Sequence, residues 1–204
     1  MWRRTLNEPL TMVRSLTLCP SNFSLNHDVH SEAAYNCLGY APPDGWWNPL
    51  TDPSLPPGEG AKLFPAWVSG YYKHGKLPVE VEMHTPLKEP QPTLATMTDE
   101  EVESSIYPPP GNPGGSDETL YRAGKHHSYW TEIRKLTFFP EVLDDTWAKI
   151  PLRFVWGDRS IWEVPYGKWC IEGELEEAKA QGKFAREIEL VKLPGANHFV
   201  SCAH

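Results

Sequence analysis

Residues 150–162 read Ile-Pro-Leu-Arg-Phe-Val-Trp-Gly-Asp-Arg-Ser-Ile-Trp, and this stretch decides the fold. Ile150 to Trp156 is a compact apolar run of strand length, and Gly157 stops it. The charged, periodic segment 172–185 predicts an exposed amphipathic helix, and Ile188 to Leu193 predicts a second strand. A strand, a helix and a strand in this order predict a βαβ unit with parallel, neighbouring strands.

Upstream of this unit the chain divides into zones of different character. Within residues 1–20, the run from Val13 to Cys19 alternates partly and carries β-branched residues, so it predicts one short buried strand, which Pro20 closes. Residues 21–118 are punctuated by Pro and Gly and predict an irregular, partly helical insertion. Residues 119–204 contain the βαβ unit and form the predicted C-terminal core.

Three helices are predicted outside the βαβ unit. Apolar residues recur at helical spacing between Glu59 and His74. Thr98 and Glu101 stand three residues apart, in the pattern of a capping box that starts a short helix. A further helix is predicted from Ser116 to about Lys135.

Composition excludes several classes of function. The 204 residues are 40% hydrophobic and carry a net charge of −8, which is typical of a soluble globular protein. Without a Lys/Arg cluster, nucleic acid is not expected as a partner. No apolar run reaches the ~20 residues that span a bilayer, so no membrane association and a cytoplasmic location are expected. The four Cys match no zinc pattern, and His27/His30 and His126/His127 lack a third ligand, so no metal site is expected.

Polar residues follow both strands of the βαβ unit, where ligands sit in open α/β sheets. Asp158 comes directly after the first strand, and His198 ends the Gly195-Ala-Asn-His loop after the second. An acid hydrogen-bonded to one imidazole nitrogen fixes the tautomer and leaves the other nitrogen free to act as a base.

Together these segments resemble the C-terminal portion of an α/β-hydrolase of the abhydrolase-1 type, nearest the fungal members of that superfamily. A Pro-led strand ending in Gly, an acid-bearing loop, a helix and a strand ending in Gly-x-x-His carry the resemblance. It implies an α/β fold, a partial α/β-hydrolase with a short parallel sheet remnant and a Pro-rich cap at 21–118. It further implies hydrolysis of an ester-like or related bond in a small apolar molecule, with His198 as base and Asp158 as acid, and it implies no metal or organic cofactor.

The acid departs from the family pattern. The family acid stands three residues after the loop Gly, where this chain has Ser160. Asp158 stands one residue after that Gly, where it can instead cap the turn. Some relatives carry the acid after the earlier strand, but no carboxylate follows Cys19 before Asp28, so Asp158 is the favoured acid.

The nucleophile is missing from the pattern. The family needs Gly-x-Ser-x-Gly between a strand and a helix; Ser116 comes closest but reads as a helix start, and Ser69 has no preceding Gly. We therefore expect these 204 residues to show no hydrolytic turnover. Either the reading frame is a truncated form of a longer enzyme, or the chain is a degenerate relative that has lost the nucleophile. The rival interpretation is a non-catalytic binding protein that holds a small apolar ligand in the cap. The exposed edges of a reduced sheet also predict self-association.

Overall fold

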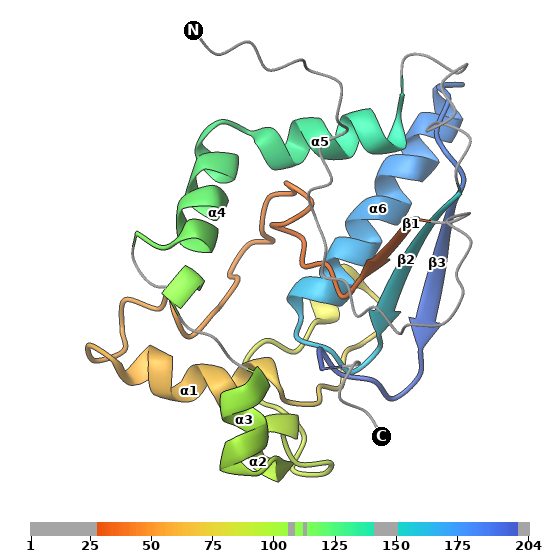
Figure 1. Cartoon of the computed structure of the whole chain (residues 1–204). Coiled ribbons are helices and arrows are strands. Elements are labelled where there is room, and N and C mark those ends of the chain that lie inside the picture. The colour runs from red at the N-terminus through yellow and green to blue at the C-terminus, as the bar shows by residue number, and fades with distance from the viewer. Residues whose placement is uncertain (1–27, 106–108, 112–113, 141–150, 200–204) are drawn as a thin grey trace, which may run out of the picture.

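The computed structural model describes residues 28–105, 109–111, 114–140 and 151–199. These residues form a mixed α/β structure with a short parallel sheet, drawn in Figure 1. The elements, in chain order, are β1 (Asp28–Ser31), α1 (Glu59–Val68), η1 (Pro78–Glu80), α2 (Thr93–Thr96), α3 (Asp99–Ser105), η2 (Pro109–Gly111), α4 (Ser116–His126), α5 (Tyr129–Phe138), β2 (Leu152–Gly157), α6 (Glu163–Ala180) and β3 (Ile188–Leu193).

The sheet has the strand order β1-β2-β3, and both pairs are parallel. Leu152 is in register with Asp28 on one side and with Ile188 on the other. The prediction of a βαβ unit with adjacent parallel strands is therefore confirmed for β2, α6 and β3.

The sheet has a strand, Asp28–Ser31, in a segment where none was predicted. Val13 to Cys19, the predicted strand, lies outside the described residues. The segment Asp28–Ser31, which the sequence analysis placed in the insertion, pairs with β2 and belongs to the sheet. Its composition is polar, so its strand conformation comes from pairing with β2 rather than from local preference.

The helix of the βαβ unit starts earlier than its charged segment indicated. It begins at Glu163, nine residues before the predicted start at 172, and it ends at Ala180. Pro165 falls in its first turn, where the missing N–H breaks no helical hydrogen bond. Val164 and Ile171 in the first half of the helix are fully buried, whereas the exposed residues of the helix lie in its second half.

The helix predicted from Ser116 to about Lys135 is divided into α4 and α5. Ser128 lies at the break with φ of 58°, in the left-handed region. The two helices pack closely because Gly124 of α4 has no side chain where the indole of Trp130 lies. The division lets α4 turn away from the line of α5, as Figure 1 shows.

The two predicted helix starts upstream are confirmed. Helix α1 begins at Glu59 but ends at Val68, before the predicted His74. Helix α3 follows the capping box, in which Thr98 N donates to Glu101 over 2.8 Å and Glu101 N donates back to the Thr98 hydroxyl over 3.3 Å.

The core covers one face of the sheet. Leu152 and Phe154 of β2 point to this face and pack with Phe138 of α5 and Ile171 of α6. A second cluster joins the start of α6 to α1 and to the segment after β1; its buried members are Tyr35, Trp67, Tyr72, Ile161, Trp162 and Val164. On the opposite face of the sheet, Arg153 and Glu189 form a solvent-exposed ion pair of 2.7 Å.

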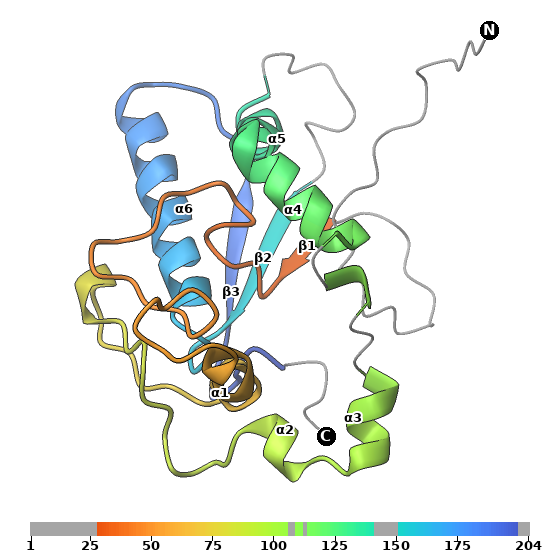
Figure 2. The same cartoon turned by 90° about the vertical axis from the view of Figure 1, so that its left-hand side faces the viewer.

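The C-terminal ends of the strands point toward the side of the molecule that holds α1 (Figures 1 and 2). The N-terminal end of α6 lies at the same edge. Across the described ranges, no helix is both long and apolar enough to cross a membrane.

Candidate active site

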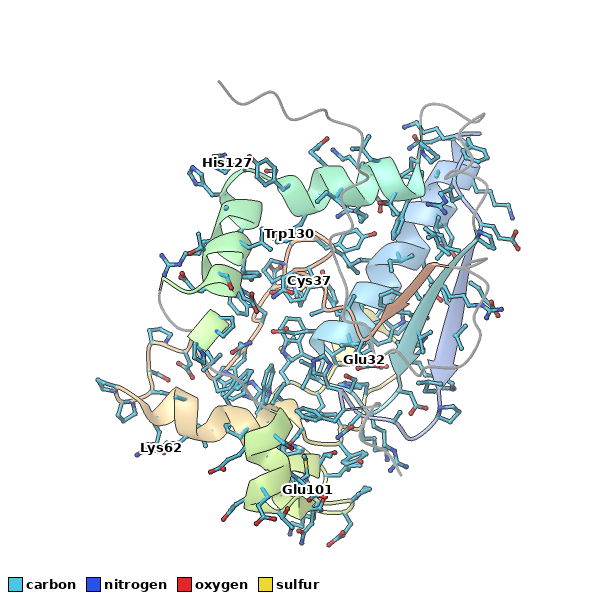
Figure 3. All side chains as sticks on the ribbon, in the orientation of Figure 1. Glu32, Cys37, Lys62, Glu101, His127 and Trp130 are labelled. Carbon is cyan, nitrogen blue, oxygen red and sulfur yellow. The ribbon has the colours of Figure 1, made fainter. Side chains whose placement is uncertain are left out.

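Loops that follow each strand meet at the C-terminal edge of the sheet. Glu32 comes directly after β1, residues 158–162 connect the end of β2 to α6, and His198 lies in the loop after β3. Figure 3 places Glu32 where the strand ends meet the N-terminal end of α6.

Glu32 is a buried carboxylate held by hydrogen bonds from the neighbouring loops. One oxygen accepts from the backbone N–H of Gly157, and the other accepts from the hydroxyl of Ser160 over 2.5 Å. The side chain is only 6% exposed. The backbone N–H of Glu32 donates to Val155 O over 2.9 Å, which extends the β1–β2 pairing by one residue and fixes where the side chain begins.

Glu32 also adopts an unfavourable backbone conformation. Its φ is 54°, in the left-handed region, which costs a residue with a side chain ~1–2 kcal/mol. Backbone strain of this kind persists where the surroundings over-determine the conformation and is frequent at functional sites. In this conformation the Glu32 carboxylate faces the loops that follow β2 and β3, where it contacts Ser160 and His198.

His198 forms a pair with Glu32. Its Nδ1 lies 3.2 Å from a Glu32 carboxylate oxygen, and its side chain is 28% exposed. Because an ionised carboxylate only accepts hydrogen bonds, Nδ1 carries the proton and donates a hydrogen bond to Glu32. Nε2 is then the unprotonated nitrogen, available as a base on a ring that solvent reaches.

The loop that carries His198 is fixed on several sides. The buried amide of Asn197 donates to Ser69 O over 2.7 Å and to the hydroxyl of Thr93 over 2.8 Å. Arg159 N donates to Ala196 O over 3.0 Å, which joins this loop to the one after β2. The neighbouring residue His198 is therefore positioned by backbone and amide contacts that do not involve its own ring.

Asp158, the acid favoured by the sequence, does not hold the position next to His198. Its carboxylate accepts from the backbone N–H of Gly195 over 2.7 Å, and its second oxygen lies 3.8 Å from the amine of Lys192. Asp158 therefore ties the loop after β2 to the loop after β3, the turn-capping alternative considered for it. The acid paired with His198 is Glu32.

Sequence reasoning missed Glu32 because it did not predict the strand Asp28–Ser31 that precedes it. The acid was sought after Cys19, whereas the strand that reaches the site ends at Ser31. Ser160 stands where the sequence resemblance led us to expect the acid, and its hydroxyl donates to Glu32. The absence of a carboxylate at position 160 was the one sequence signal that the acid had to come from another loop.

A second buried carboxyl, Glu163, lies close enough to His198 for their charges to interact. It starts α6, is 6% exposed, and accepts a hydrogen bond of 3.0 Å from the amide of Asn48. Burial raises the pKa of Glu163, while the Asn48 hydrogen bond and the charge of His198 oppose the rise.

Glu163 also borders a cavity of about 270 Å³. The cavity lies between the segment 35–51, helices α4 and α5, and the start of α6. Figure 2 shows this segment running between α4 and α6. Residues of the predicted insertion thus contribute to its wall, although His198 itself does not line it.

The two serines considered as nucleophiles have structural roles. The Ser69 hydroxyl donates to Pro65 O over 2.7 Å and accepts from Leu94 N over 3.3 Å. Ser116 is the first residue of α4, as its sequence context predicted. Among the described residues, no group of three or more His, Cys, Asp or Glu side chains is arranged to hold a metal ion.

Comparison with known proteins finds no match: no family model, no curated protein and no solved structure is similar to this chain.

Proposed function

We propose that Glu32 and His198 form the acid–base part of a hydrolytic active site that acts on an ester-like bond in a small molecule. The observation that carries the proposal is the 3.2 Å contact between His198 Nδ1 and the buried Glu32 carboxylate. The α/β-hydrolase resemblance of the C-terminal segments supports it independently of the geometry.

The chemistry follows from the orientation of the ring. His198 Nε2 accepts a proton from water as its oxygen bonds to the ester carbonyl carbon. The Glu32 carboxylate stabilises the resulting imidazolium, which then gives the proton to the leaving alcohol oxygen as the carbon–oxygen bond breaks. The products are a carboxylic acid and an alcohol. This route needs no nucleophile elbow and predicts slow hydrolysis of activated esters. The sequence alone predicts no turnover, and an ester assay decides between the two predictions.

The test is hydrolysis of p-nitrophenyl acetate by the full chain and its variants. A positioned general base contributes ~10²–10⁴ in rate, so His198→Ala is expected to lose at least about tenfold. Glu32→Gln should fall toward the rate of His198→Ala. His127→Ala is the matched control, because His127 is exposed at the outer turn between α4 and α5 (Figure 3).

Equal rates for the wild-type chain and His198→Ala, with His127→Ala also unchanged, would overturn the catalytic proposal. The cavity beside Glu163 favours a second candidate function, binding of a small ligand without turnover. In that case the wild-type chain binds a ligand in the cavity, and substitution of His198 has no effect on activity.

A further inference from the structure

The cavity beside Glu163 has a wall of distinctive chemistry. Its wall is rich in aromatic rings, contributed by the segment after β1 and by α4 and α5: Tyr35, Tyr40, Trp46, Tyr121 and Trp130. Figure 3 shows Trp130 on the side of α5 that faces α4 and the segment carrying Cys37. The wall also includes a buried acid, Glu163, whose partner Asn48 borders the same space.

The negative charge of Glu163 affects the pKa of two tyrosines that line the same cavity. Burial, and after it the charge of Glu163, raise the pKa of Tyr35 above its usual range. Burial and the charges of Cys37 and Glu163 raise the pKa of Tyr121. Tyr35 and Tyr121 come from two separate segments and line the same cavity as Glu163, whose own pKa is raised by burial.

The rings of this wall already stack with a cation at one point. The guanidinium of Arg134 lies 3.8 Å from the ring centre of Tyr40. Arg134 itself does not line the cavity, and Glu174 pairs with its guanidinium at 3.0 Å. The basic side chain that does line it, Lys125, is exposed at the end of α4, so water screens its charge more than that of the buried Glu163. The interior of the cavity is therefore complementary to positive charge.

We propose that the cavity binds a small organic cation of the alkyl- or quaternary-ammonium class, with its charge against Glu163 and its alkyl groups against the aromatic rings. Aromatic faces attract such cations through their quadrupole, most strongly where water is excluded. At ~30 Å³ for each water molecule, the cavity of about 270 Å³ has room for a compact ligand of this kind. The proposal holds whether or not His198 is catalytic.

Calorimetric titration of the full chain tests this, with choline as the probe. Its comparison ligand is 3,3-dimethylbutan-1-ol, in which carbon replaces the quaternary nitrogen and the shape is kept. We expect saturable binding of choline and at least about tenfold weaker binding of the neutral alcohol.

Variants assign the charge. Glu163→Gln keeps an acceptor for Asn48 but removes the charge, so choline affinity should fall by at least about tenfold while the neutral alcohol is little affected. Lys125→Gln should tighten choline binding, because it removes the opposing charge. Glu177→Gln, on the exposed end of α6, is the matched control and should leave both affinities unchanged.

Several results would overturn the proposal: no saturable binding of choline, equal affinity for choline and the alcohol, or an unchanged affinity in Glu163→Gln. If Glu163→Gln does not fold, Trp46→Leu replaces it, because Trp46 is 40% exposed at the cavity wall. Its choline affinity should fall, and an unchanged value counts against the site. Binding is measured without turnover, so failure here leaves the Glu32–His198 proposal untouched.

Discussion

Replacing Glu32 by Ala tests whether this carboxylate is a structural centre of the site as well as its acid. The variant removes the acceptor for the Gly157 N–H and the Ser160 hydroxyl, both in buried residues. A stranded buried donor costs ~1–3 kcal/mol. Releasing the buried carboxylate and admitting water beside the partly exposed His198 offsets part of this cost. We therefore expect the free energy of unfolding to fall by about 2–4 kcal/mol.

The assay is urea unfolding followed by tryptophan fluorescence and circular dichroism, with the slope of the free energy against urea checked for constancy. Glu189→Ala is the matched control, because it removes a carboxylate from the exposed pair with Arg153 on the same sheet. Exposed pairs contribute ~0–1 kcal/mol, so this variant should change little. A loss in Glu32→Ala no larger than in Glu189→Ala would refute the reasoning.

Further predictions concern the surrounding loops. Gly157→Ala should destabilise the chain by ~1–3 kcal/mol, because its Cβ meets backbone of the loop after β3, whereas Gly173→Ala has open space in α6 and should stabilise it by ~0.5–1 kcal/mol; urea unfolding compares the two. Burial lowers the pKa of His74, so the stability it contributes is complete above the ordinary imidazole pKa of ~6.5 and is lost as pH falls below it. From neutral to mildly acidic pH, the urea midpoint of unfolding should therefore fall less in His74→Gln than in the wild-type chain. Equal falls in the two chains would count against this prediction. Asp158→Asn should keep at least about half of the His198-dependent ester hydrolysis, because Asp158 lies outside the Glu32–His198 pair. A loss as large as in His198→Ala would restore Asp158 as the acid.

The βαβ unit could be predicted because its pattern is local. The apolar run that ends at Gly157 and the strand Ile188–Leu193 each have the length and composition of a buried strand. The loop Gly-x-x-His then places His198 at the strand ends, where the structure has it. These features could be predicted because each one is encoded by the pattern of consecutive residues.

Glu32 could not be predicted in the same way, because its position depends on pairing across the chain. Asp28–Ser31 lacks the alternation of a strand and becomes one only by pairing with Leu152 to Val155. The start of α6 was missed for a related reason. Ile161, Trp162 and Val164 are all buried, and the charged Glu163 between them is buried as well, so the segment shows no helical alternation of buried apolar and exposed polar residues.

The measurement that tests the central claim most directly is the NMR spectrum of the histidine ring nitrogens in the ¹⁵N-labelled chain. At a pH where the ring is neutral, the account predicts that His198 carries its proton on Nδ1. This signature should be lost in Glu32→Gln and kept in Asp158→Asn. A His198 ring protonated on Nε2, or a spectrum that responds to Asp158→Asn and not to Glu32→Gln, would contradict the pairing of Glu32 with His198.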